Sequence, residues 1–321
     1  MYLPAGSYSS FVITMTAEGG ASCTKTANSA IVIERGKITT ITLTGLSFGA
    51  SVPTGAINGR FTINAGGDKV YFSQGNLQYQ ASTGTWRFAT NQYDCIGNSN
   101  SSISSTNSGW IDLFGWGTSG WNSGANCYQP WSTSTSYADY YPGGAYTNNL
   151  TGSYANADWG VNNAISNGGN AAGLWRTLTH EEWDYLFNTR SASTVNGTAN
   201  ARYAKGTVNS VAGVILFPDS YTHPDGLAQP TNINSSGANY TGNNYSTSDW
   251  TAMQTAGAVF LPAAGRRYGT SVNNVGSYGY YWSASYYSSY YAWLVYFSSG
   301  GLDAEYANFR NYGRSVRLVR G

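Results

Sequence analysis

Short alternating segments separated by turn-forming residues are the feature that most constrains the fold of this chain. The stretch "GRFTINAGGDKVYFSQGNLQYQASTGTWRFA" alternates apolar and polar residues and is interrupted by glycine, asparagine and serine. A period of two is typical of strands, and the interrupting residues are typical of tight turns. The pattern therefore predicts a run of β-hairpins over residues 60–88.

The first fifty residues alternate in the same way and predict an incomplete β-sandwich over residues 1–50. Gly19-Gly20 supplies a turn, and residues 51–58, with Pro53, predict a linker. The opening residues read like the middle of a β domain, so we expect the chain to start inside a longer protein. An export signal is not present in this sequence. The expected strands are 10–17, 30–35 and 37–46.

The composition favours turn-rich extracellular β structure. The chain has 40 glycines, aromatic residues make up 15% and charged residues only 10%, and the formal net charge is +1. A balance this close to neutral gives no basic surface for nucleic acid. No stretch is long and apolar enough to insert into a membrane. We therefore expect neither nucleic-acid binding nor direct membrane insertion.

Two helices are expected among the strands. Thr179 and Glu182 form a capping box, and the next apolar residues recur at helical spacing on one face. A weaker helix is expected over residues 158–166. Two helices among short strands and large ordered loops predict the α+β class.

A glycine-, tryptophan- and asparagine-rich stretch over residues 109–131 predicts a long loop held to the domain by its own side chains. Sugar stacking by these tryptophans is the alternative. Cys95 and Cys127 could pair or remain free. The four tryptophans are Trp110, Trp116, Trp121 and Trp131.

The end of the chain is dominated by tyrosine and serine. Ten of the 27 tyrosines lie between Tyr278 and Tyr312. Core strands prefer aliphatic residues, whereas tyrosine with serine is the composition of a recognition surface. Ordinary cross-strand aromatic packing is the alternative, although adjacent pairs such as Tyr286-Tyr287 cannot both point inward.

Four motifs carry a resemblance that covers about residues 56–321. The motifs "VYFSQGNLQY", "LWRTLTHEEWDYLF", "FLPAAGRRYG" and the spaced "YYWSAS…AW…V.F…R..G.SVRLVR" resemble C-type-lectin-like domains of bacterial surface proteins. Among C-type-lectin-like domains, the resemblance is to the subset shared by the variable proteins of diversity-generating retroelements and the fibrobacter-type major paralogous domain. The N-terminal piece is similar to the last strands of fimbrillin-like or immunoglobulin-like domains of gut bacteria. The resemblance implies a ligand-binding domain over residues 59–321 with a variable region at about 278–314.

In such proteins the variable region is rewritten by adenine-directed mutagenesis, which converts asparagine codons mainly to Tyr, Ser, Asp, Ala, Gly and Phe codons. Glu305 cannot arise from an asparagine codon in this way. The resemblance implies a scaffold at Trp282, Ala292, Trp293, Phe297, Arg310, Gly313, Ser315, Val316 and Arg317. It implies a variable, ligand-binding face made of Tyr286, Tyr287, Ser289, Tyr290, Tyr291, Tyr296, Ser298, Ser299, Asp303, Tyr306, Asn308, Phe309 and Tyr312.

The terminal strand "RSVRLVR" is expected to pair with the strand in "KVYFSQG" and anchor this face. Val316, Leu318 and Phe72 would then face the core, although alternation alone does not fix the buried face.

The motifs of several enzyme classes are absent. Formylglycine-generating enzymes share this fold family and need a late cysteine pair, but no cysteine follows Cys127. His180 and His223, the only histidines, are far apart in sequence, and no GxSxG or HExxH motif occurs. The calcium ligands of sugar-binding C-type lectins are not recognisable, since Gln229-Pro230 is followed by Thr231. We expect no enzyme activity, no cofactor and no metal.

These features predict a binding protein at the cell surface, in the extracellular space or on a phage virion. Its partner would be a protein or glycan on another cell or surface, and its N-terminal region would connect it to a pilus, anchor or virion. A fixed-specificity carbohydrate-binding adhesin is the first alternative, and a structural surface-layer or pilus component is the second.

Overall fold

The computed structural model describes residues 5–9, 11–16, 22–27, 31–35 and 51–321. The chain divides into two compact units, Met1–Val52 and Pro53–Gly321. The predicted linker crosses this division, and its last three residues belong to the first strand of the second unit.

The described residues of the first unit form two antiparallel strand pairs. β1 (Gly6–Tyr8) pairs with β4 (Ile31–Ile33), and β2 (Phe11–Thr16) pairs with β3 (Ser22–Ala27). β2 and β4 fall within the strands expected at 10–17 and 30–35, whereas β1 and β3 were not expected. The expected strand at 37–46 and the Gly19-Gly20 turn lie outside the described residues.

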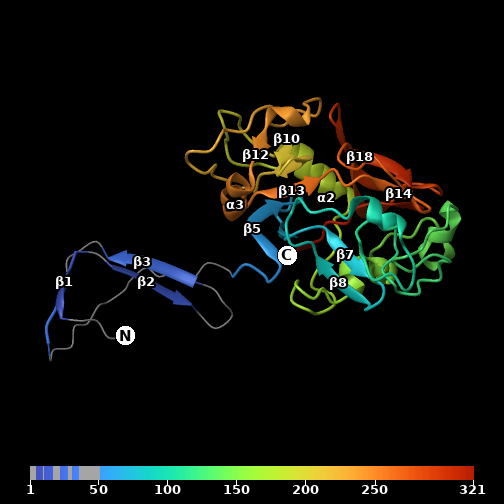
Figure 1. The fold of residues 1–321 in the computed structure, drawn as a ribbon, viewed down its shortest axis with the longest axis horizontal. Helices are drawn as coiled ribbons and strands as arrows, with labels where there is room; N and C mark the ends of the chain where they lie inside the picture. Colours follow the sequence, from blue (N-terminus) through green and yellow to red (C-terminus); the bar gives the residue numbers. More distant parts are fainter. Residues whose placement is uncertain (1–4, 10, 17–21, 28–30, 36–50) are drawn as a thin grey trace. The chain divides into compact units, whose positions relative to one another are not determined.

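The second unit is built from five small sheets (Figure 1). The expected hairpins lie in the first two of them. Listed in strand order, the sheets are β20 (Val319–Arg320), β6 (Lys69–Ser73) and β5 (Ala56–Thr62); β8 (Thr85–Phe88), β7 (Leu77–Gln80) and β9 (Trp110–Ile111); β12 (Asn244–Tyr245), β10 (Tyr203–Val208), β11 (Val211–Leu216) and β13 (Val259–Pro262); β15 (Ser271–Asn273), β14 (Arg266–Tyr268) and β19 (Tyr312–Gly313); and β16 (Gly279–Tyr286), β17 (Tyr291–Phe297) and β18 (Leu302–Phe309).

The predicted α+β class is wrong, because the regular secondary structure of the described residues is mainly β strands in small sheets, with few and short helices. Helices form at both expected positions, but each is only one to three turns long. The helices are α1 (Trp159–Asn162), α2 (His180–Asp184), the π-helical turn η5 (Tyr185–Thr189), α3 (Thr247–Thr255), and the 3-10 turns η1 (Gly97–Ser101), η2 (Tyr137–Tyr140), η3 (Pro142–Gly144), η4 (Gly152–Ala157) and η6 (Tyr240–Gly242).

The predicted capping box at α2 is confirmed. The Thr179 side chain accepts from the Glu182 backbone N–H, and the Glu182 carboxylate accepts from the Thr179 N–H at 2.8 Å. α2 then runs into η5 and buries Trp183, Leu186 and Phe187 in the core. The weaker helix expected over 158–166 is the single turn α1, capped by Asp158.

The expected pairing of the terminal strand is also confirmed. Val319 is opposite Phe72 in β20–β6, and the Ser73 N–H donates to the Leu318 carbonyl at 2.9 Å. Val316, Leu318 and Phe72 are all buried. The strand order β20–β6–β5 places the last residues beside β6, so they complete the sheet that the first strands of this unit began (Figure 1).

The segment between β8 and α1 is an ordered loop region with 3-10 turns. Trp116 is buried there, and its Nε1 donates to the Ser283 carbonyl at 2.9 Å. The Trp116 N–H donates to the Arg310 carbonyl at 2.9 Å. The loop is thus fastened to the end of the chain, which places it beside the tyrosine-rich segment.

Candidate functional site

The tyrosine-rich segment forms the antiparallel sheet β16–β17–β18. Tyr280 is opposite Tyr296, and Trp282 is opposite Leu294. Across the next pair Tyr291 is opposite Phe309. Register shifts interrupt both pairs, so the faces do not alternate uniformly along the strands.

The positions that the resemblance assigned to a scaffold are buried, with one exception. Trp282 lies in the core, and its Nε1 donates to the Phe114 carbonyl at 2.7 Å. Trp293 is the exception, since it is half-buried beneath Tyr287. The other buried scaffold positions are Ala292, Phe297, Arg310, Gly313, Ser315, Val316 and Arg317.

Aromatic rings from the expected variable positions form a continuous surface, here called the aromatic ridge. It also contains Trp293 and two residues from outside the C-terminal segment 278–321, here called the tail. These two residues are Tyr137 and Tyr268. Neighbouring ring centroids lie 4.4 to 6.4 Å apart. The full ridge is Tyr137, Tyr268, Tyr287, Tyr290, Tyr291, Trp293, Phe309 and Tyr312.

The ridge has exposed rings supported by half-buried ones. Tyr287 is 50% exposed, Tyr290 46% and Tyr268 43%. Tyr291 and Phe309 are half-buried and meet edge to face at 4.8 Å. The pKa of Tyr137 is raised, mainly by its hydrogen bond with Tyr290 and to a lesser extent by burial. Exposed rings held by neighbouring rings present contact area with little side-chain freedom left to lose.

A second tyrosine group packs with the core cluster that contains Trp282 and Leu294. Tyr296 contacts Tyr280 at 5.5 Å and Tyr306 at 5.0 Å. Tyr278 stacks with Tyr280, and all but Tyr280 are half-buried. For these positions the cross-strand packing alternative describes the contacts well.

The remaining expected site residues are not all brought to the ridge. Ser298 and Ser299 follow the end of β17, and Asp303 is exposed in β18. Ser298 is buried, and its carbonyl accepts from Lys205 Nζ at 2.8 Å. Burial lowers the pKa of Lys205 to about 8.

Three expected residues flank the ridge with polar groups that are already bonded. The Tyr286 N–H donates to Asn149 Oδ1 at 2.8 Å. The Ser289 carbonyl accepts from the Tyr141 hydroxyl at 2.6 Å, and Asn308 Nδ2 donates to the Tyr306 hydroxyl at 3.2 Å.

A small hollow of about 90 Å³ opens within the ridge. Asn311 lies in its lining and is only 3% exposed. Its Nδ2 donates to the Thr135 carbonyl at 2.9 Å, while its Oδ1 is buried without a hydrogen-bond partner. The hollow is lined by Thr135, Tyr137, Tyr268, Phe309, Asn311 and Tyr312.

Buried arginines support the ridge from behind. The Arg314 guanidinium lies 4.6 Å from the centroid of Tyr280, 5.0 Å from Trp282 and 5.4 Å from Tyr312. Burial lowers the pKa of Arg314 to about 9. Arg310 Nη2 donates to two loop carbonyls at 2.6 Å and lies over Trp116. Of the rings in these cation–π contacts Tyr312 belongs to the ridge, and the others are core rings beneath it.

His180, the first residue of α2, contacts the ridge at Trp293. Its ring stacks on Trp293 at 4.0 Å, and its Nε2 lies 3.8 Å from Glu305 Oε1. The Glu181 carboxylate lies 3.9 Å from Nδ1. His180 is thus packed against the scaffold side of the ridge.

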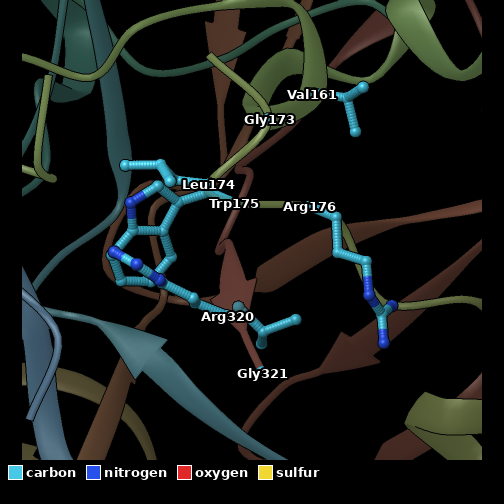
Figure 2. A pocket seen from close by; sticks show the side chains of 8 residues that line it. Val161, Gly173, Leu174, Trp175, Arg176, Arg320 and Gly321 are labelled. Atoms are coloured by element: carbon cyan, nitrogen blue, oxygen red, sulfur yellow. The ribbon is translucent and has the colours of Figure 1, made fainter. Parts of the chain in front are cut away.

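A second hollow, of about 360 Å³, lies away from the ridge between α1 and the terminal strand (Figure 2). Trp175 in its lining is buried, and its Nε1 donates to the Gly168 carbonyl at 2.7 Å. Arg176 is held by Glu182 through bonds of 2.6 and 2.7 Å. The ring in this hollow offers no exposed stacking face, so the aromatic ridge is the better candidate site.

Among the described residues, the ridge carries neither a metal-binding cluster nor a disulfide. Within the described residues, no group of three or more His, Cys, Asp or Glu side chains is placed to hold a metal ion. Cys23, Cys95 and Cys127 are free thiols. No helix in the described part of the chain has the length and apolar character needed to cross a bilayer.

Comparison with known proteins gives one partial match. Residues 231–319 match the model of a domain of unknown function, DUF8237. No curated protein matches the chain, and no solved structure does. The matched segment contains the β16–β18 sheet, whereas Thr135 and Tyr137 in the wall of the small hollow lie outside it.

Sequence reasoning missed Tyr137, Tyr268 and Asn311. Tyr268 follows "GRR" within a motif quoted for the resemblance, but nothing local marks it as exposed. The aromatic pairs Tyr137–Tyr290 and Tyr268–Tyr312 are long-range contacts, which a single sequence does not reveal.

Proposed function

We propose that this chain is a non-enzymatic ligand-binding protein whose aromatic ridge recognises a protein or glycan on another cell or surface. The observation that carries the proposal is that the tail contains two groups of positions, one exposed and one buried. Apart from Ser298, the expected ligand-binding positions are at least partly exposed, and apart from Trp293 the expected scaffold positions are buried. A surface of this kind can change its side chains while its fold stays intact.

The proposal includes diversification of the ridge by a retroelement, which rests on the resemblance of the tail. Tyrosine suits such a surface, because one residue type offers large contact area at low entropic cost. The proposed location is the cell surface, the extracellular space or a phage virion. The first unit would connect the binding unit to a pilus, anchor or virion.

Deep sequencing of the coding region for residues 270–321 in the source population tests this proposal. We expect changes at ridge positions such as Tyr287, Tyr290 and Phe309, with Trp282 and Phe297 unchanged. A template copy of the segment and a reverse transcriptase gene should lie nearby.

A uniform sequence with no template copy would contradict diversification. It would favour the alternative of a fixed-specificity carbohydrate-binding adhesin, which the small hollow in the ridge supports. Changes spread equally over buried and exposed positions would contradict both, because they would show no selection for an intact scaffold.

A further inference from the structure

We propose that the hollow of about 90 Å³ in the aromatic ridge accepts one uncharged sugar ring of a glycan. This inference rests on the proposed function, since it names the ligand class of the same surface. It adds a position for the ligand and assigns roles to Tyr268 and Asn311, which lie outside the expected variable face.

The walls of the hollow are suited to the apolar face of a sugar. Four of its six lining residues are aromatic, and Tyr268 and Tyr312 meet at an interplanar angle of 57° with centroids 4.9 Å apart. Two rings at such an angle form a corner, so a ligand ring can stack on one and touch the other. A hollow this small takes one face of a single sugar ring, and the rest of that ring and of the glycan lies along the exposed rings of the ridge.

Asn311 provides the polar contact that a sugar would complete. Its side-chain N–H is used by the Thr135 carbonyl, which fixes the orientation of the amide. Its Oδ1 is left as a buried acceptor without a partner. An unsatisfied buried acceptor is unfavourable, and a ligand hydroxyl that displaces the side chains covering it and donates to it removes this cost. A sugar ring has apolar faces and hydroxyl donors around its edge, so it matches both parts of the hollow.

The surrounding charges favour a neutral ligand. None of the six lining residues is charged. Behind Tyr312, the guanidinium groups of Arg266 and Arg314 lie 5.1 and 5.4 Å from its ring centroid. A cationic ligand on that ring would meet two like charges, so the aromatic walls do not form a cation-binding cage. An anionic ligand would find no cation in the lining to pair with.

Ligand-observed saturation-transfer NMR on the full chain tests the inference. The probes are the methyl glycosides of galactose, glucose, mannose and N-acetylglucosamine, with choline and the methyl glycoside of sialic acid as charged comparators. N-acetyltyrosine amide serves as a neutral peptide-like probe. We expect transfer to at least one neutral glycoside and none to the charged probes.

Variants then locate the binding. Tyr268→Ala removes an exposed wall and should weaken the glycoside roughly tenfold or more. Asn311→Leu should weaken it similarly, provided that circular dichroism shows an intact fold. Tyr146→Ala, which removes a 44% exposed tyrosine that does not line the hollow, should leave the affinity unchanged.

The opposite outcomes separate the inference from the proposed function. Binding that survives Tyr268→Ala but is lost in Tyr287→Ala would overturn the hollow as the sugar site, while a ligand-binding ridge would stand. Binding of the tyrosine amide in place of the glycosides would overturn the ligand class. No transfer to any neutral glycoside at millimolar concentration would also overturn the inference, and population sequencing would still test the proposed function separately.

Discussion

Trp282 and Tyr287 are five residues apart, yet they occupy opposite environments. Trp282 is fully buried and hydrogen-bonded to the Phe114 carbonyl, whereas Tyr287 is half exposed on the ridge. Trp282→Ala should therefore lower the free energy of unfolding by roughly 3–5 kcal/mol, through lost burial and a cavity. Tyr287→Ala should change it by less than about 0.5 kcal/mol. Urea unfolding followed by fluorescence measures both.

Comparable losses in the two variants would contradict the division into scaffold and ridge at this position. Tyr290→Ala serves as a second exposed variant, because its contacts are with Tyr137 and Tyr291 at the surface. If all three variants lost several kcal/mol, the tail would be a packed core segment and its tyrosines would be unsuited to variation.

At the scale of elements, the pairing of β16 with β17 depends on a close approach at Gly279. A Cβ there would lie 2.0 Å from Cζ of the buried Phe297 ring opposite it. Gly279→Ala should destabilise the protein by roughly 1–3 kcal/mol or more, because the ring has no room to retreat. Gly300→Ala, in the turn between β17 and β18, is the matched control with nothing within 4 Å of the new Cβ. Equal melting temperatures for the two variants would show that the strand pair yields easily.

Elements with strong local signals were predictable. The capping box gave the start of α2, and alternation gave β2, β4, the hairpins and the terminal strand. α3 was missed although Ser246 and Asp249 form a capping box too, because its face has no clear apolar period; only Trp250 and Met253 are buried. The α+β prediction was wrong because the helices that these patterns form are too short to make up a large part of the fold.

At the scale of the whole molecule, the candidate site could be predicted only in part. The tail supplies Tyr287, Tyr290, Tyr291, Phe309 and Tyr312, which composition and resemblance single out. The hollow also needs Tyr137 from a loop more than a hundred residues earlier, and Tyr268 from β14. Those contacts depend on the packing of the long loop against the tail, and no local pattern encodes that packing.

Global stability should also depend on two buried carboxyl groups in the second unit. Burial raises the pKa of Asp112 and of Asp158 to about 6, against the hydrogen bonds that each carboxylate accepts. Because the pKa is higher in the folded state, the fold binds more protons than the unfolded chain between about pH 4 and 6. The contribution of each group is thus fully present below about pH 4 and is lost as the pH rises through 6. Each is worth roughly 3 kcal/mol, since one pKa unit corresponds to about 1.4 kcal/mol.

Asp158→Asn isolates this effect from the other titrating groups, some of which act in the opposite direction. The lowered pKa of Asp219, for example, gives stability above pH 4. The variant loses one of the bonds from the Gly160 and Thr177 N–H groups, so it should melt below the wild type at pH 4. That deficit should shrink or reverse by pH 7, because only the wild type ionises there. Asp303→Asn removes an exposed carboxylate and controls for net charge. A deficit for Asp158→Asn that stays constant or grows from pH 4 to 7 would mean that the buried carboxylate is well compensated by its hydrogen bonds.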